Sequence, residues 1–114
     1  MNTHIKGVKG EDIAAQYLTK HDYKIIERNY KCHFGEIDII AVNEGFAVFV
    51  EVKSRSSDKF GLPREAVSPY KQQRIVGAAK YWLFKTKNTG VPVRFDVVEI
   101  LDGSVTLLKD AFRP

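Results

Sequence analysis

The stretch EIDIIAVNEGFAVFVEVK, residues 36–53, predicts a β-hairpin on which the rest of the fold is built. Both halves are rich in β-branched and aromatic residues, and Glu44-Gly45 supplies a tight turn between them. With the turn at this point, the numbers of facing residues sum to 89. Because side chains alternate along a strand, one face of the hairpin is then wholly apolar. Its members are Ile37, Ile39, Ala41, Val48, Val50 and Val52.

The other face of this hairpin gathers charged side chains at one end. The same register sets Asp38 opposite Glu51 and Glu36 opposite Lys53. Two carboxylates that face each other across a sheet repel, and a shared divalent cation would relieve the repulsion. Hard oxygen ligands of this kind suit Mg²⁺. The alternative is a solvated hairpin end on which Glu36 and Lys53 form a surface ion pair of little energetic weight.

The residues around the hairpin predict two helices and three further strands. Apolar residues at helical spacing predict a first helix over about Lys6–Lys20, and Ser68-Pro69 opens a second helix that runs to about Lys87. We expect the other strands at Tyr23–Tyr30, Val93–Ile100 and Ser104–Lys109, and a long loop over residues 54–68. The order is αβββαββ. It indicates one α/β (α+β) domain over residues 1–114, with a central mixed sheet flanked by helices.

Length and composition fit one ordinary globular domain of 114 residues, 44% hydrophobic and 28% charged. The single cysteine, Cys32, excludes an internal disulfide and suits a reducing cytoplasm. The longest stretch without Asp, Glu, Lys or Arg is Ile13–Thr19, which is far too short to span a bilayer. The N-terminal residues are charged where a signal peptide would be apolar. We therefore expect a cytoplasmic protein without a membrane partner.

The excess of basic residues is concentrated in one segment. The chain has 18 Lys and Arg against 14 Asp and Glu, a net charge of +4. Residues 53–74 hold six of the basic and two of the acidic residues, so the remaining chain is balanced at 12 of each. This pattern indicates an anionic partner such as nucleic acid, although a solvated charged face is the alternative. The residues expected to contact phosphates are Arg55, Lys59, Arg64, Lys71 and Arg74.

Two further acidic residues stand in apolar surroundings. Glu11 lies within the apolar stripe of the first helix, where a carboxylate needs a partner, and a cation beside Asp38 and Glu51 would be one. The alternative places Glu11 in the first helical turn, where it would complement the helix dipole. Asp96, in the apolar strand RFDVV, is more typical of a structural acid than of a catalytic one, and the alternative places it near the same face as Asp38 and Glu51.

Five segments follow one another along the chain: KGEDIAAQYL (9–18), FGEIDIIA (34–41), VFVEVKSR (48–55), FGLPREAVSPYKQQRI (60–75) and RFDVVEI (94–100). In this order they resemble the blocks of the YraN family, bacterial proteins described as predicted endonucleases. Asp38 with Glu51-Val52-Lys53 is similar to the core motif of the PD-(D/E)XK nuclease superfamily, whose proline is Ile37 here. The archaeal Holliday junction resolvases are similar in element order. They tend to have arginine where this chain has Asp12, which puts specificity for such junctions in doubt.

The resemblance implies a restriction-endonuclease-like core and metal-dependent hydrolysis of phosphodiester bonds in DNA, with branched or flapped DNA as one candidate substrate. It implies that Asp38, Glu51 and the backbone carbonyl of Val52 hold Mg²⁺ or Mn²⁺. Lys53 then orients or activates the attacking water, and Glu11 completes the acidic set. One rival is a nucleic-acid-binding module with the same fold and little or no turnover. Another is an adaptor whose basic loop binds an acidic protein partner, and a homodimer is one oligomeric state that the sequence leaves open.

Overall fold

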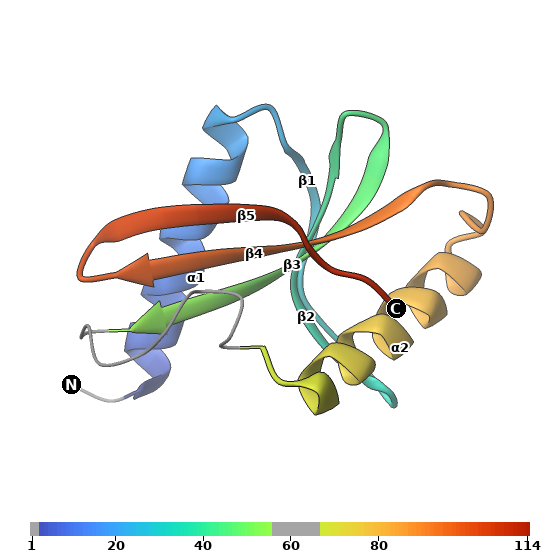
Figure 1. Ribbon diagram of the computed structural model, residues 1–114, viewed down its shortest axis with the longest axis horizontal. Coiled ribbons are helices and arrows are strands. Elements are labelled where there is room, and N and C mark those ends of the chain that lie inside the picture. The colour runs from blue at the N-terminus through green and yellow to red at the C-terminus, as the bar shows by residue number, and fades with distance from the viewer. Residues whose placement is uncertain (1–2, 56–66) are drawn as a thin grey trace.

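The computed structural model describes residues 3–55 and 67–114, with side chains from residue 10 onward. The elements follow the order αβββαββ, which confirms the predicted fold class (Figure 1). No described helix combines the length and apolar character that a membrane span requires. The elements are α1 (Thr3–Lys20), β1 (Lys24–Cys32), β2 (Gly35–Asn43), β3 (Phe46–Arg55), α2 (Pro69–Lys85), β4 (Val93–Leu101) and β5 (Ser104–Phe112).

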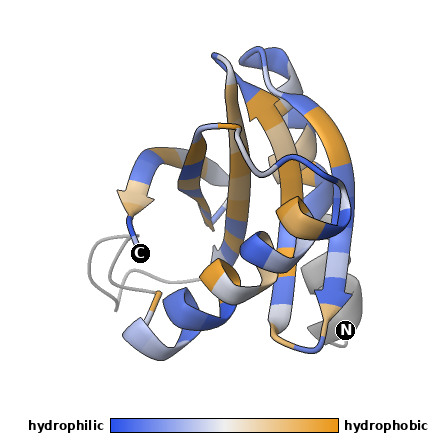
Figure 2. Ribbon diagram, turned by 90° about the vertical axis from the view of Figure 1, so that its right-hand side faces the viewer, coloured by the Kyte–Doolittle hydropathy of each residue, from blue (hydrophilic) through white to orange (hydrophobic). Residues whose placement is uncertain are grey.

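The five strands form one mixed sheet in the order β1-β2-β3-β4-β5. Only β3 and β4 run parallel, because α2 connects them as a crossover, whereas the other neighbours are antiparallel. The two helices cover opposite faces of the sheet (Figure 1). Each helix encloses its own hydrophobic cluster, to which the apolar stretches of the central strands contribute from either face (Figure 2).

The predicted register of the β2–β3 hairpin is confirmed. Ile39 pairs with Val50, and the following pairs continue with the same sum of residue numbers up to the turn. At the turn, Glu44 and Gly45 have φ angles of 54° and 83°, as a two-residue hairpin turn requires. The ladder ends at Ile39, however, and the first residues of β2 pair with β1 instead. Ile37 therefore packs in the cluster under α2 and not beside Ile39, which corrects the predicted apolar face.

The start of α2 follows the sequence prediction. The Ser68 hydroxyl oxygen accepts a hydrogen bond from the Lys71 backbone N–H at 3.1 Å, and Pro69 is the first helical residue. The helix ends at Lys85, and Lys87, which we expected inside it, has a φ of 62°.

The strands are longer than predicted because each gains pairs at its ends. Arg55 extends β3 into the expected loop through its pairing with Leu101 of β4. Phe112 extends β5 beyond the predicted end because it pairs with Phe95. The remainder of the predicted loop, residues 56–66, lies outside the described residues.

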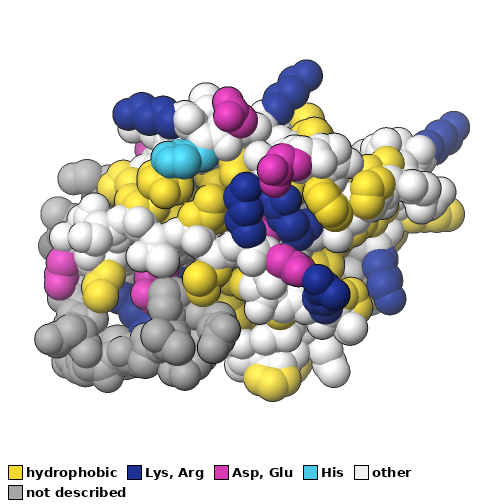
Figure 3. Space-filling view, turned by 45° about the horizontal axis from the view of Figure 1, so that its top comes forward, with side chains coloured by type: hydrophobic (Ala, Val, Ile, Leu, Met, Phe, Trp, Pro, Cys, Tyr) yellow, Lys and Arg dark blue, Asp and Glu magenta, His cyan; other side chains and the backbone are white. Residues whose placement is uncertain are grey.

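The charged residues around the β2–β3 turn are paired across strands. The Glu44 carboxylate lies 3.5 Å from Arg94 Nη1 and 3.3 Å from Lys109 Nζ. Acidic and basic side chains lie next to one another near the centre of one face of the molecule (Figure 3). Opposite charges at this end of the sheet are therefore largely matched.

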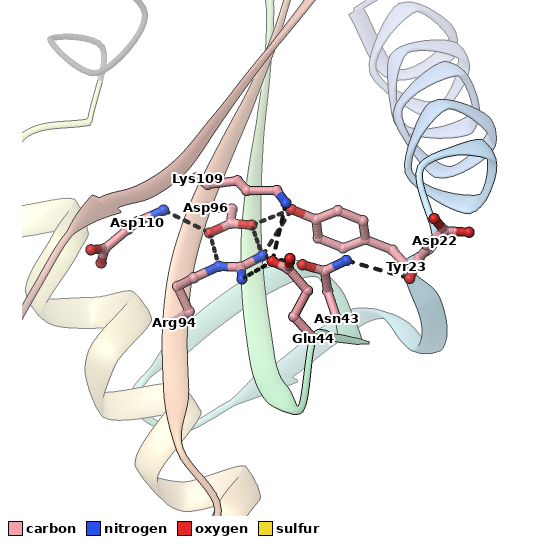
Figure 4. Close-up of polar contacts among 8 residues, drawn as sticks. All are labelled: Asp22, Tyr23, Asn43, Glu44, Arg94, Asp96, Lys109 and Asp110. Atoms are coloured by element: carbon pink, nitrogen blue, oxygen red, sulfur yellow. Dashed lines mark hydrogen bonds and ion pairs between the residues drawn. The ribbon is translucent and has the colours of Figure 1, made fainter.

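Beneath this surface a buried polar network joins β4 to the segment between α1 and β1 and to the end of β2 (Figure 4). The fully buried Asp96 carboxylate accepts hydrogen bonds from the Tyr23 hydroxyl at 2.6 Å and from Arg94 at 2.8 and 2.9 Å. It also accepts one from the Asp110 backbone N–H, while Arg94 donates to the Asn43 side chain at 2.8 Å. Burial and the contact with Asp96 raise the pKa of Tyr23. Asp96 is thus structural, as its sequence context indicates.

We expect Asp96→Asn to destabilise the fold by about 3 kcal/mol, because it leaves the buried Arg94 guanidinium with the exposed Glu44, 3.5 Å away, as its charged partner. The free energy of unfolding, measured by urea denaturation, checks this. Asp102→Asn is the control, since Asp102 is exposed in a turn at a φ of 48° that Asn adopts readily. Equal stability of the two variants would contradict the role of Asp96.

Candidate functional site

Asp38 lies where β2 leaves β3. Its carboxylate oxygen Oδ2 accepts a hydrogen bond from the Val52 backbone N–H at 2.8 Å. Asp38 and Glu51 follow the hairpin register but come just after its last pair, Ile39 with Val50. The Asp38 side chain therefore bonds the backbone of β3 at the point where the strand ladder has ended. This holds the half-buried Asp38 carboxylate against the strand that carries Glu51.

The Glu51 carboxylate is 95% buried and is held between an acid and two lysines. Burial, followed by the nearby Asp38 charge, raises the pKa of Glu51 to about 7. Lys71 Nζ and Lys53 Nζ lie 3.7 and 3.8 Å from Glu51 Oε2, and their charges oppose the rise. The structure thus brings together Asp38, Glu51 and Lys53, as the sequence predicts.

Lys53 does not form the surface ion pair with Glu36 that was the alternative interpretation. Glu36 pairs with Lys31 in the β1–β2 ladder, and Lys53 stands beside Glu99 in the β3–β4 ladder. The expected pairing fails because β2 has already separated from β3 at this level of the sheet. The Lys53 ammonium group is consequently directed to Glu51, with about a third of its side chain exposed.

Glu11 approaches the site from α1. Burial and the Asp38 charge raise the pKa of Glu11, whereas a hydrogen bond with Asn29 and the charge of Arg28 oppose the rise. Because α1 begins at Thr3, Glu11 is not in the first helical turn, and the dipole alternative is wrong. Glu11 neighbours Asp38, but no three acidic, histidine or cysteine side chains gather into a metal cluster among the described residues.

The residues predicted to contact nucleic acid have different surroundings. Arg55 forms an ion pair with Glu99 at 2.9 Å, and both side chains are largely buried. Lys71 contacts Glu51, as described above. Arg74 is exposed and stacks over the Tyr70 ring at 5.8 Å. Lys59 and Arg64 lie outside the described residues.

Two members of the site were not recognised in the sequence. Lys71, which we expected to contact phosphate, is also a partner of Glu51. The reason is that α2 is the crossover between the parallel strands β3 and β4 and begins above the end of β3. Glu99 is a second buried acid on β4, next to Lys53 and paired with Arg55. Recognition of the parallel β3–β4 pairing would have identified both residues.

The arrangement is thus a pair of interacting carboxylates with two lysine ammonium groups at the end of a central strand. Comparison with known proteins identifies the family of the chain. Residues 10–100 match the model of the Uncharacterised protein family UPF0102, also called YraN. The chain belongs to this family, which confirms the family resemblance seen in the sequence.

The UPF0102 protein of Clostridium perfringens (strain SM101 / Type A) is 50% identical over 113 residues, which cover 94% of this chain and 93% of that protein. The UPF0102 protein of Lachnoclostridium phytofermentans is 45% identical, with coverage of 98% and 96%. That of Persephonella marina is 42% identical, with coverage of 98% and 97%. The similarity therefore extends over nearly the whole length of each protein.

We expect the free energy of unfolding of the metal-free protein to decrease as the pH rises from 4.5 to 7. The reason is that the unfolded chain releases the Glu51 proton at lower pH than the folded protein does. Glu51→Gln removes this titration and should flatten the pH dependence of the unfolding free energy by roughly 1–3 kcal/mol. Urea denaturation in EDTA at pH 5, 6, 7 and 8 measures the effect. The exposed Glu36→Gln is the matched control, and a Glu51→Gln profile parallel to the wild type would contradict the raised pKa.

Proposed function

We propose that this protein is a metal-dependent nuclease that hydrolyses phosphodiester bonds in DNA. The observation that carries the proposal is the buried Glu51 carboxylate, which interacts with Asp38 and has Lys53 and Lys71 Nζ within 4 Å. Two like charges in such a place destabilise the fold, so the arrangement is better explained by a ligand that needs them. The family resemblance supports a nuclease, with branched DNA among the candidate substrates.

The donor set fits Mg²⁺ or Mn²⁺. Mg²⁺ sites commonly use one or two carboxylates, with water and substrate phosphate oxygens completing the shell, and Asp38 and Glu51 supply two. The backbone carbonyl of Val52 is the third donor that the nuclease motif implies, and Glu11 is an acid nearby. Such an ion would supply charge neutralisation on the scissile phosphate and a more acidic water.

The remaining groups of the site orient the water, compensate charge on the phosphate and position the carboxylates. The Lys53 ammonium group, partly exposed beside Glu51, orients the attacking water and compensates the charge that develops on the phosphate oxygens. Lys71 adds a second positive charge from the first turn of α2. The hydrogen bond between Asp38 and Val52 fixes the position of one carboxylate against the strand that carries the other.

We expect millimolar Mn²⁺ to raise the thermal midpoint of the wild type and to leave that of Glu51→Gln unchanged, because the variant lacks one of the two carboxylates. Scanning calorimetry with and without EDTA measures the shift. Glu36→Gln, which changes an exposed acid of the same strand, should respond like the wild type. An equal midpoint shift for the wild type and Glu51→Gln would exclude this metal site.

We expect Lys53→Met to lower DNA cleavage by about 10²-fold or more while it retains the metal-induced shift and most of the DNA affinity, because it keeps the side-chain stem and removes only the charge. Cleavage is followed on linear, flapped and four-way branched DNA with Mg²⁺ or Mn²⁺. Lys80→Met, on an exposed part of α2, is the control. DNA binding without cleavage by the wild type would favour the binding module, and unchanged cleavage by Lys53→Met would exclude the role of Lys53.

A further inference from the structure

A stripe of alternating aromatic and basic residues runs along the exposed side of α2. Tyr70, Arg74, Tyr81 and Lys85 are four, seven and four residues apart, which places them on one side of the helix. Tyr70 is 69% exposed although it is a large aromatic residue. The side chains that pack into the core belong to the other side of the helix: Ile75, Ala78, Ala79 and Trp82.

The members of this α2 stripe contact one another in two pairs. The Arg74 guanidinium lies 5.8 Å from the centre of the Tyr70 ring, and Lys85 Nζ lies 5.6 Å from that of Tyr81. Phe34, from the turn between β1 and β2, adds a third ring 5.6 Å from Tyr81 and is 47% exposed. The result is a surface with π-faces and positive charges in alternation.

The positive charge of α2 favours an anionic partner. The helix contains four basic residues and no acidic residue, in contrast to the matched charges around the β2–β3 turn. A second copy of the chain would place like charges against each other in a symmetric contact. Close approach of another helix is also hindered, because Phe34 already covers Gly77, with its Cβ 3.3 Å from where a Cβ would stand. The surface therefore does not suit self-association.

We propose that the α2 stripe binds an unpaired DNA strand and leads it toward Glu51. The inference rests on the proposed function, because it takes the substrate of the neighbouring site as the ligand. Exposed aromatic rings stack on unpaired bases, whereas the bases of a duplex are already stacked on one another. Lys71, one residue from Tyr70, contacts Glu51 and so connects the stripe to the site. The substrate class is consequently DNA with a single-stranded segment.

Binding is measured by fluorescence anisotropy in EDTA, so that no cleavage occurs, with an oligothymidine of about 12 nucleotides. We expect it to bind more tightly than a duplex of equal length. Tyr70→Ala should weaken binding by about tenfold without a change in salt dependence, and Tyr70→Trp should restore it. Arg74→Ala should reduce the slope of log affinity against log salt by about 0.7. Lys80→Ala, on another side of α2, should leave the slope nearly unchanged.

Several results would overturn the inference: duplex bound as tightly as oligothymidine, Tyr70→Ala binding like the wild type, or polyglutamate competing as well as oligothymidine. The proposal for the stripe and the proposal for the nuclease site can be rejected independently of each other. Cleavage of branched DNA that is unaffected by Tyr70→Ala would reject the stripe and retain the nuclease. Stripe-dependent binding of oligothymidine without any cleavage would reject the nuclease and retain the stripe. Circular dichroism of each variant is the check that the exposed substitutions leave the fold intact.

Discussion

The end of the β2–β3 ladder at Ile39 and Val50 is the constraint on which the site depends. Beyond this pair the two strands separate, and the backbone of β3 needs a new hydrogen-bond partner because buried N–H groups are costly when unpaired. The Asp38 carboxylate provides one for Val52. The separation thus turns an acid that would stand in a regular ladder into a fixed group beside Glu51.

Two charged clusters on the same sheet have opposite energetic consequences. Around Asp96, the carboxylate oxygens are matched by Arg94, Tyr23 and a backbone N–H, and the network joins β4 to β5 and to the segment that follows α1. Around Glu51, burial and then the charge of a second carboxylate raise the pKa of Glu51, and the lysines compensate only from 3.7 Å or more. A fold that satisfies its polar groups at one end and leaves like charges together at the other indicates a functional constraint at the second.

The sequence predicts the hairpin well because its information is local. Alternation and the Glu44-Gly45 turn specify which residues pair, and the structure has that register. The place where the strands separate could not be predicted, because an apolar Ile37 fits either hydrophobic cluster. The neighbours of Lys53 were missed for a related reason. They depend on the parallel pairing of β3 with β4, which is set by a crossover and leaves no short-range pattern.

The rotation of α2 about its own axis relates the site to the outer surface. Lys71 stands one turn before Ile75 on the side of α2 that faces the sheet, yet it remains partly exposed because it lies above the end of β3. The same rotation buries Trp82 against Phe49, where its indole N–H donates to Glu27, and turns Tyr70 outward. Core packing therefore fixes both the position of the Lys71 charge at Glu51 and the direction of the exposed stripe. A helix rotated by one residue would lose both, so the core of this small protein is itself part of the arrangement of its candidate site.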